Sequence, residues 1–324
     1  MQQTYYDFKA LEILKGKKPL LVCDDAFDKF GIQLPCKFVR FSNFTSNPRY
    51  ESVMFGVEIL KINKCDFIVA IGGGSSIDVA KCIKHHGFFD IPMMAVPTTS
   101  GTGSEATHFA VIYMNGEKQS IADEKLLPEY VILQPDMLNT LPLYQKKCTM
   151  LDALCQAIES WWSKKATTES IEYSRKAIKL ILDHMDSYLK NEDTGNMNML
   201  IASNLAGKAI NITTTTAPHA MSYKITSYYG LPHGHAVALC LPKVWGHMKN
   251  YNDIAKALGK QNYLEAILFF EQLLQTLQIL PPENVTADDL DMLTNSVNAQ
   301  RLANNHVRLE GDTIRELYEQ ILNY

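Results

Sequence analysis

Residues 67–81 read FIVAIGGGSSIDVAK and carry the strongest indication of fold class in the sequence. The unbroken apolar run at 67–71 is typical of a strand that is buried on both faces of a parallel sheet. The three glycines that follow let the backbone turn sharply and approach a ligand without a Cβ in the way. Ser75 or Ser76 can cap the helix that continues to about His86, and the start of that helix suits a phosphate. The stretch therefore predicts a strand, a phosphate-binding turn and a helix.

A tight strand-to-helix turn without any ligand is the alternative interpretation of this loop, but such a turn needs only one or two glycines. Three glycines followed by two serines favour phosphate binding. The loop is not a P-loop because Lys81 lies too far along the helix, and it does not match G-x-G-x-x-G.

Strand-like and helical segments alternate before residue 142. Further strands are predicted at 20–23, 38–41, 93–96, 109–114 and 131–133. With a helix at 50–63, this alternation predicts a parallel α/β sheet. After residue 142 the spacing is helical, at 148–162, 169–190, 196–212, 262–278 and 313–322. We therefore expect an α/β nucleotide-binding domain over 1–142 and an all-α domain over 143–324.

The composition excludes several classes of protein. A chain of 324 residues is long enough for about two domains, and 46% apolar residues exclude a disordered chain. The net charge of −4 and the scattered basic residues argue against nucleic-acid binding. No stretch is long and apolar enough to span a membrane, and residues 1–20 lack the features of a signal peptide. The seven cysteines form no C-x-x-C pair and suit a reducing compartment, so we expect a cytoplasmic protein.

A second loop, PTTSGTGSEAT at 97–107, also follows a predicted strand and is dense in hydroxyls and glycine. Two such loops at strand ends form a cleft at one edge of the sheet, where open α/β folds bind ligands. Asp24 follows the first of the predicted strands, where a carboxylate can accept hydrogen bonds from a ribose and repel a 2′-phosphate. Capping of the next helix is the alternative role for Asp24.

The helical half carries candidate metal ligands. Asp152 and Gln156 are four residues apart and share a helix face, while His219 and His233 lie further along the chain. Two histidines and a carboxylate can hold a divalent transition metal. By spacing alone, exposed or core positions for these residues remain the simpler alternative.

Taken together, these motifs resemble those of the iron-containing alcohol dehydrogenases, also called group III dehydrogenases. The resemblance extends from Asp24 to the Asn304-Asn305 region and rests on Asn47-Pro48, GGGSSID at 72–78, PTTSGTGSE at 97–105, DAL at 152–154, AIE at 157–159 and PHG at 232–234. DALCQAIESWWS at 152–163 and the segments around both histidines are most similar to the branch that includes phosphonoacetaldehyde reductases. The resemblance implies a dehydroquinate synthase-like fold, with the active site in the cleft between the two domains.

The resemblance also implies a ligand set and catalytic residues. The metal, zinc or iron(II), would be held by Asp152, His219 and His233, with Gln156 where the family usually has histidine. Tyr223 stands where the family often has another histidine, and it can pass a proton. Tyr223, His219 and His233 are the implied catalytic residues.

The cofactor implied is NAD(H) rather than NADP(H), because of Asp24. The implied cofactor-binding residues are Asp24, Asn47, Gly73, Gly74, Ser75, Asp78, Thr98, Thr99, Ser100, Thr102 and Lys118. The implied active unit is a homodimer.

The expected function is a metal-dependent, NAD(P)H-linked aldehyde reductase that converts phosphonoacetaldehyde to 2-hydroxyethylphosphonate. Lys208, Lys224 and Lys243 are the sequence candidates for holding the anion. An alcohol dehydrogenase for short uncharged aldehydes is the main alternative. A dehydroquinate synthase-type lyase and a non-enzymatic nucleotide-binding module are two further alternatives.

Overall fold

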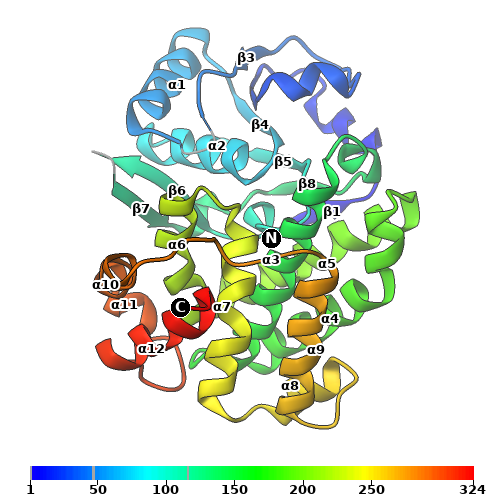
Figure 1. Ribbon diagram of the computed structural model, residues 1–324. Coiled ribbons are helices and arrows are strands. Elements are labelled where there is room, and N and C mark those ends of the chain that lie inside the picture. Colours follow the sequence, from blue (N-terminus) through cyan, green and yellow to red (C-terminus); the bar gives the residue numbers. More distant parts are fainter. Residues whose placement is uncertain (1, 46–47, 115–116) are drawn as a thin grey trace.

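The computed structural model describes residues 2–45, 48–114 and 117–324, with a sheet at one end and helices at the other (Figure 1). The sheet has six strands in the order β1-β8-β5-β4-β2-β3, and all neighbours are parallel. The strands are β1 (Gln3–Tyr5), β2 (Pro19–Cys23), β3 (Val39–Phe41), β4 (Phe67–Gly72), β5 (Met93–Pro97) and β8 (Tyr130–Ile132). The glycine-rich stretch follows β4, near the middle of this sheet, as its apolar run predicted.

Alternate residues of the central strands face opposite sides of the sheet. Ile68 and Ala70 pack under α1 (Tyr50–Asn63) and α2 (Gly74–His86). Val69 and Ile71 pack on the other side against the short 3-10 helices η1 (Phe8–Leu14) and η2 (Asp25–Lys29). Both faces of β4 are therefore covered, which explains why its sequence is continuously apolar.

The prediction for residues 109–114 is right about the strand but wrong about the strand with which it pairs. The segment at 109–114 does form a strand, β6 (Phe109–Met114), but it lies outside the parallel sheet and pairs antiparallel with β7 (Glu117–Ala122). Because β7 begins three residues after β6 ends, the chain has no room for the crossover that parallel pairing needs.

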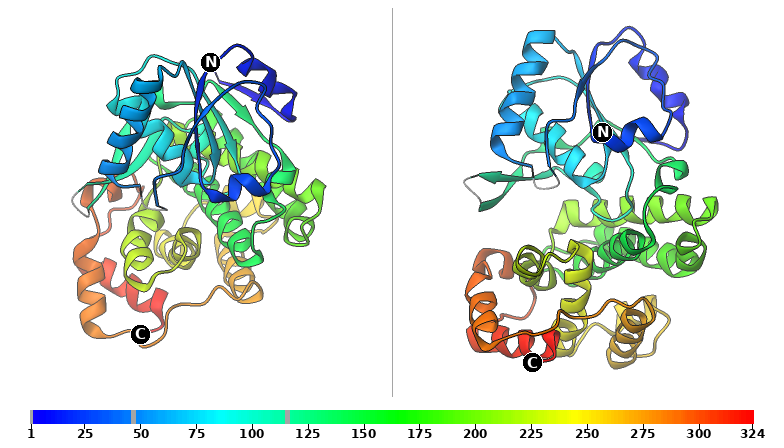
Figure 2. Two further views of the ribbon diagram at one scale, coloured as in Figure 1. Left: turned by 90° about the horizontal axis from the view of Figure 1, so that it is seen from above. Right: turned by 45° about the horizontal axis from the view of Figure 1, so that its top comes forward.

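The second half of the chain is helical and surrounds one continuous apolar core. Its helices are α3 (Leu143–Trp162), α4 (Thr168–Leu189), α5 (Asp193–Thr213), α6 (Ala217–Tyr229), α7 (His233–Met248), α8 (Asn252–Ala257), α9 (Tyr263–Thr276), α10 (Ala287–Ser296), α11 (Ala299–Leu302) and α12 (Gly311–Leu322). The central helix α3 packs against α4, α5 and α7. Figure 2 shows the sheet and the helices as two bodies of the fold, with the blue-to-cyan segments on one side. No helix among the described residues is long and apolar enough to cross a membrane.

The loop after β5 joins the sheet to the helices. The buried Lys81 of α2 donates from Nζ to the carbonyl oxygens of Ser104, Thr107 and Phe109, the last two at 2.7 and 2.8 Å. On the helical side, Gly103 lies against Gly207 of α5, so closely that a Cβ at position 103 would come within 2.5 Å of the Gly207 Cα. Backbone contact and a buried ammonium group together hold this loop between the two halves.

Gly103 also has a φ of +61°, a conformation that residues with a side chain rarely adopt. Backbone strain and the contact with Gly207 therefore both oppose a side chain at this position. We predict that Gly103→Ala lowers the free energy of unfolding by about 1–3 kcal/mol more than Gly259→Ala does. Gly259 is the matched control because its φ is +72° and an added Cβ would meet nothing within 4 Å. Urea denaturation of both variants measures the difference, and equal losses would show that contact with Gly207 contributes nothing.

Candidate active site

A cavity of about 1640 Å³ lies where the carboxyl ends of β2, β4 and β5 face α3, α6 and α7. Its lining includes Asp24 after β2, Gly73 after β4 and Thr98 after β5. From the helices it includes Asp152 and His219, among others. The crevice outside the carboxyl ends of parallel strands is the usual ligand site of open α/β sheets.

The glycine loop enters this cavity with its backbone. Gly73 is the N-cap of α2, so Ser75 and Ser76 lie inside the helix, and the prediction that one of them is the N-cap residue is wrong. Helix N-termini present N–H groups and a positive dipole end, which suit a phosphate. A Cβ on Gly74 would lie 2.8 Å from Thr102 Oγ1, so the glycine permits close packing between the two loops.

Most of the cofactor-binding residues predicted from the sequence line the cavity, but not all of them do. Lining the cavity are Asp24, Gly73, Gly74, Ser75, Asp78, Thr98, Thr99 and Thr102. Ser100 is fully buried instead, and its hydroxyl donates to the Tyr188 hydroxyl at 2.7 Å inside the helical core. Lys118 lies in β7 opposite Tyr113, and its side chain is outside the described part of the chain, as is the whole of Asn47.

Two of the lining carboxylates also have local structural contacts. Asp24 caps η2, because its Oδ1 accepts from the Ala26 N–H at 2.9 Å. Asp78 accepts from the Ser104 hydroxyl at 2.6 Å and from the Val111 N–H at 3.1 Å, which ties α2 to the loop after β5 and to β6.

The candidate metal ligands converge on one wall of the cavity. Asp152 lies on α3, His219 on α6, and His233 is the first residue of α7. One ligand atom from each of these residues lies within 4.8 Å of the others, and His219 Nε2 is 3.3 Å from Asp152 Oδ1. Three side chains from three helices therefore meet at a spacing that one cation can bridge.

Glu159, two turns after Asp152 on α3, orients His219. Its Oε1 contacts His219 Nδ1, and its Oε2 accepts from the Thr216 backbone N–H at 2.7 Å and from the Thr216 hydroxyl at 2.8 Å. The Thr216 hydroxyl in turn accepts from Trp162 Nε1 at 2.7 Å. This arrangement turns Nε2 of His219 toward Asp152 and leaves Glu159 fully buried.

The buried charges around His219 favour a positive group at its position. Burial alone would lower the pKa of His219, but Glu159 and Asp152 raise it overall to about 10. Burial alone would raise the pKa of Asp152, yet the His219 hydrogen bond and the charge of His233 hold it below its usual value. Two buried carboxylates thus surround an imidazole that would otherwise be neutral at pH 7.

Gln156 lies one turn after Asp152 on the same face of α3 and lines the cavity. Its Nε2 donates to the Thr102 carbonyl oxygen at 3.3 Å, whereas its buried Oε1 has no hydrogen-bond partner among the residues that the structure describes. An unsatisfied buried acceptor costs free energy that a bound cation could recover.

Both ring nitrogens of His235, by contrast, have hydrogen-bond partners. Its Nδ1 contacts the Tyr144 hydroxyl and its Nε2 contacts the Leu280 carbonyl oxygen, each at 2.8 Å.

Tyr223 and Arg301 form the adjoining wall of the cavity. The Tyr223 ring stacks on His233, with centroids 5.6 Å apart and planes within 2°. Arg301 Nη1 donates to the Tyr223 hydroxyl at 2.9 Å. Sequence reasoning missed Arg301 because it is 78 residues from Tyr223 and belongs to no motif.

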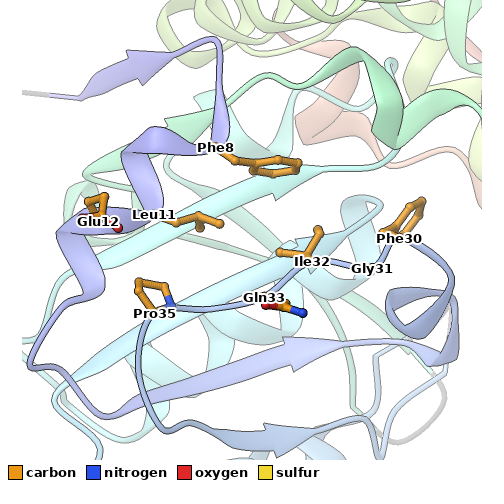
Figure 3. Close-up of a pocket in the computed structure, with 8 residues that line it drawn as sticks. All are labelled: Phe8, Leu11, Glu12, Phe30, Gly31, Ile32, Gln33 and Pro35. Carbon is orange, nitrogen blue, oxygen red and sulfur yellow. The ribbon is translucent and has the colours of Figure 1, made fainter.

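The cations that line this cavity are not those expected from the sequence. Lys164, Lys165 and Arg301 line it, whereas Lys208, Lys224 and Lys243 are not among the lining residues. Lys243 pairs with Glu271 at 2.6 Å. A second, smaller pocket lies on the sheet face that η1 covers. It is lined by Phe8, Leu11, Glu12, Phe30, Gly31, Ile32, Gln33 and Pro35 (Figure 3).

Comparison with known proteins supports this architecture over nearly the whole chain. The structure of sulfoacetaldehyde reductase from Bifidobacterium kashiwanohense in complex with NAD+ superposes with a TM-score of 0.93 at 25% identity, covering 99% of this chain and 97% of that one. The phosphonoacetaldehyde reductase of Streptomyces viridochromogenes is 28% identical over 302 residues, 80% of this chain and 76% of its own length. The NAD-dependent methanol dehydrogenase of Bacillus methanolicus is 31% identical over 275 residues, 76% of this chain and 71% of its own.

Two family models match in succession along the chain. Residues 7–135 match the model of iron-containing alcohol dehydrogenase, and residues 147–322 match the C-terminal model of the same family. The chain is therefore an oxidoreductase that belongs to the iron-containing alcohol dehydrogenase family.

Proposed function

We propose that this protein uses NADH and a divalent metal to reduce phosphonoacetaldehyde to 2-hydroxyethylphosphonate. The proposal rests on one observation above all: the glycine loop and the Asp152, His219 and His233 cluster line the same cavity. It assigns residues 1–142 to the nucleotide and 143–324 to the metal and substrate, with a homodimer as the active unit.

The cluster fits a divalent metal. Asp152, His219 and His233 would hold the ion, and the unsatisfied Oε1 of Gln156 would add a neutral oxygen donor. This mixed nitrogen and oxygen set suits zinc or iron(II). When bound, such an ion would act as a Lewis acid toward the carbonyl group of the aldehyde.

The other end of the cavity fits a dinucleotide. Gly73, Gly74 and Ser75 would bind the pyrophosphate at the start of α2, and the threonines after β5 would line the ribose and nicotinamide. The bound nicotinamide would supply the hydride. Asp24 favours NAD over NADP because its carboxylate repels a 2′-phosphate. Arg40 Nη2 donates to the Asp24 carbonyl oxygen, but Arg40 Nη1 already donates to both carboxylate oxygens of Asp28, at 2.7 and 2.9 Å.

The chain's own residues would orient ligands and move a proton. Glu159 holds His219 by Nδ1, so that Nε2 faces the other ligands. The Tyr223 hydroxyl accepts a hydrogen bond from Arg301 and would donate its proton to the reduced substrate oxygen.

The anionic substrate is supported by the cations that line the cavity and by the names of two relatives, which act on phosphonoacetaldehyde and sulfoacetaldehyde. Both substrates are aldehydes that carry an acidic group. The methanol dehydrogenase at 31% identity supports the second candidate, an enzyme for uncharged short-chain substrates.

The orienting role of Glu159 can be tested by metal affinity. We predict that Glu159→Gln weakens zinc binding about 10- to 100-fold, because an amide N–H facing Nδ1 moves the imidazole proton to Nε2. Competition with a chromophoric chelator measures the affinity. Glu105→Gln is the matched control, since Glu105 is another buried carboxylate but accepts from Asn204 outside the cluster. Equal losses in both variants would contradict the role.

Gln156 can be tested in the same way. We predict that Gln156→Ala weakens zinc or iron(II) binding by about tenfold or more, and that Gln156→His strengthens it because imidazole is the better donor. Gln145→Ala serves as control, because Gln145 lines the cavity from the same helix. Unchanged affinity in both Gln156 variants would exclude Gln156 as a ligand.

The substrate is tested by steady-state kinetics with NADH. We predict that kcat/KM for phosphonoacetaldehyde exceeds that for butyraldehyde by about tenfold or more, because charge-assisted hydrogen bonds to the anion contribute binding free energy. Equal or faster turnover of butyraldehyde would favour the uncharged-substrate enzyme. Net consumption of NADH excludes a dehydroquinate synthase-type lyase, which returns its NAD unchanged. Loss of activity to a chelator, with recovery in zinc or iron(II), excludes a non-enzymatic module.

A further inference from the structure

Arg301 connects three separate parts of the fold at the cavity. It lies on α11, and its Nη1 donates to the Tyr223 hydroxyl of α6 at 2.9 Å. Its Nη2 donates to the Ser120 hydroxyl of β7 at 2.8 Å. Arg301, Tyr223 and Ser120 all line the cavity, so the guanidinium spans from the helices to the β6–β7 hairpin.

Among the side chains that the structure describes, no carboxylate neutralises the charge of this guanidinium. Arg40, Arg175, Arg308 and Arg315 each form an ion pair with a carboxylate, whereas no described carboxylate lies within 4 Å of the Arg301 nitrogens. A guanidinium carries five N–H donors, of which the two hydroxyl contacts use two. Positive charge and donor capacity therefore remain at the wall of the cavity.

The position of Arg301 relative to the metal cluster follows from the stacking of three side chains. Arg301 Cζ lies 4.7 Å from the centroid of Tyr223, which stacks 5.6 Å from the centroid of His233. These two distances place the guanidinium carbon within about 10 Å of the His233 ring. A small substrate can therefore reach the cluster with its carbonyl group and Arg301 with a group at its other end.

We propose that Arg301, with the Ser120 hydroxyl, forms the subsite that binds the tetrahedral oxyanion of the substrate, a phosphonate or sulfonate. This inference rests on the proposed function, because it identifies the residue that selects anionic over uncharged aldehydes. The planar fork of arginine matches two oxygens of such a group and can bind them in bidentate fashion. Lys164 and Lys165, which also line the cavity, add longer-range attraction.

The test compares Arg301→Gln with Arg308→Gln, whose arginine is exposed and paired with Glu310. Two quantities are measured for the metal-loaded enzyme. The first is the ratio of kcat/KM for phosphonoacetaldehyde to that for butyraldehyde. The second is the inhibition constant of ethylphosphonate against butyraldehyde reduction. We expect Arg301→Gln to lower the ratio and weaken inhibition, each by about 10- to 100-fold, while Arg308→Gln changes neither.

A conservative variant separates loss of oxyanion binding from loss of folding. Arg301→Lys keeps the charge but loses the fork, so we expect effects between those of wild type and Arg301→Gln, with an unchanged melting temperature.

The outcomes separate this inference from the proposed function. If the wild type prefers phosphonoacetaldehyde and Arg301→Gln keeps both the preference and the inhibition, the subsite is overturned while the function stands. If the wild type shows no preference, and ethylphosphonate inhibits the wild type but not Arg301→Gln, the subsite stands and the proposed function fails. A wild-type enzyme that ethylphosphonate does not inhibit overturns the subsite.

Discussion

The site depends on two carboxylates, Asp152 and Glu159, that α3 buries on one face within the helical core. Buried charges are costly unless they are paired and hydrogen-bonded. His219 lies between them, and Thr216 supplies two further donors to Glu159. This need for positive charge explains both the raised pKa of His219 and the fit of the cluster to a divalent metal.

The loop after β5 connects this cluster to the glycine loop at the start of α2, where we propose that the nucleotide binds. Thr102 packs against Gly74 at the start of α2, while its carbonyl oxygen accepts from Nε2 of Gln156. The loop itself is held by Lys81 from the sheet side and by the contact between Gly103 and Gly207 from the helical side. The glycine loop and Gln156 are therefore connected through one tightly packed segment, and the positions of both depend on it.

Much of the fold could be predicted because local pattern and tertiary environment agree. The run at 67–71 is apolar throughout because both faces of β4 are covered, and the helix at 50–63 has the predicted bounds. The prediction for 109–114 was right about the strand and wrong about its partner. A short apolar run indicates a strand, but the pairing of that strand depends on the length of its connection to its neighbour, which the run does not describe.

The glycine loop and the family resemblance around Asp152, His219 and His233 were enough to name these candidate site residues from the sequence. Which polar residues reach the cavity depends on how the helices pack against the sheet. Ser100 belongs to the threonine-rich motif, yet its hydroxyl is buried against Tyr188. Arg301 belongs to no motif, yet it contacts Tyr223 and Ser120 across the cavity. The physical reason is that these contacts join residues 78 to 181 positions apart, which only the packing of helices against the sheet brings together.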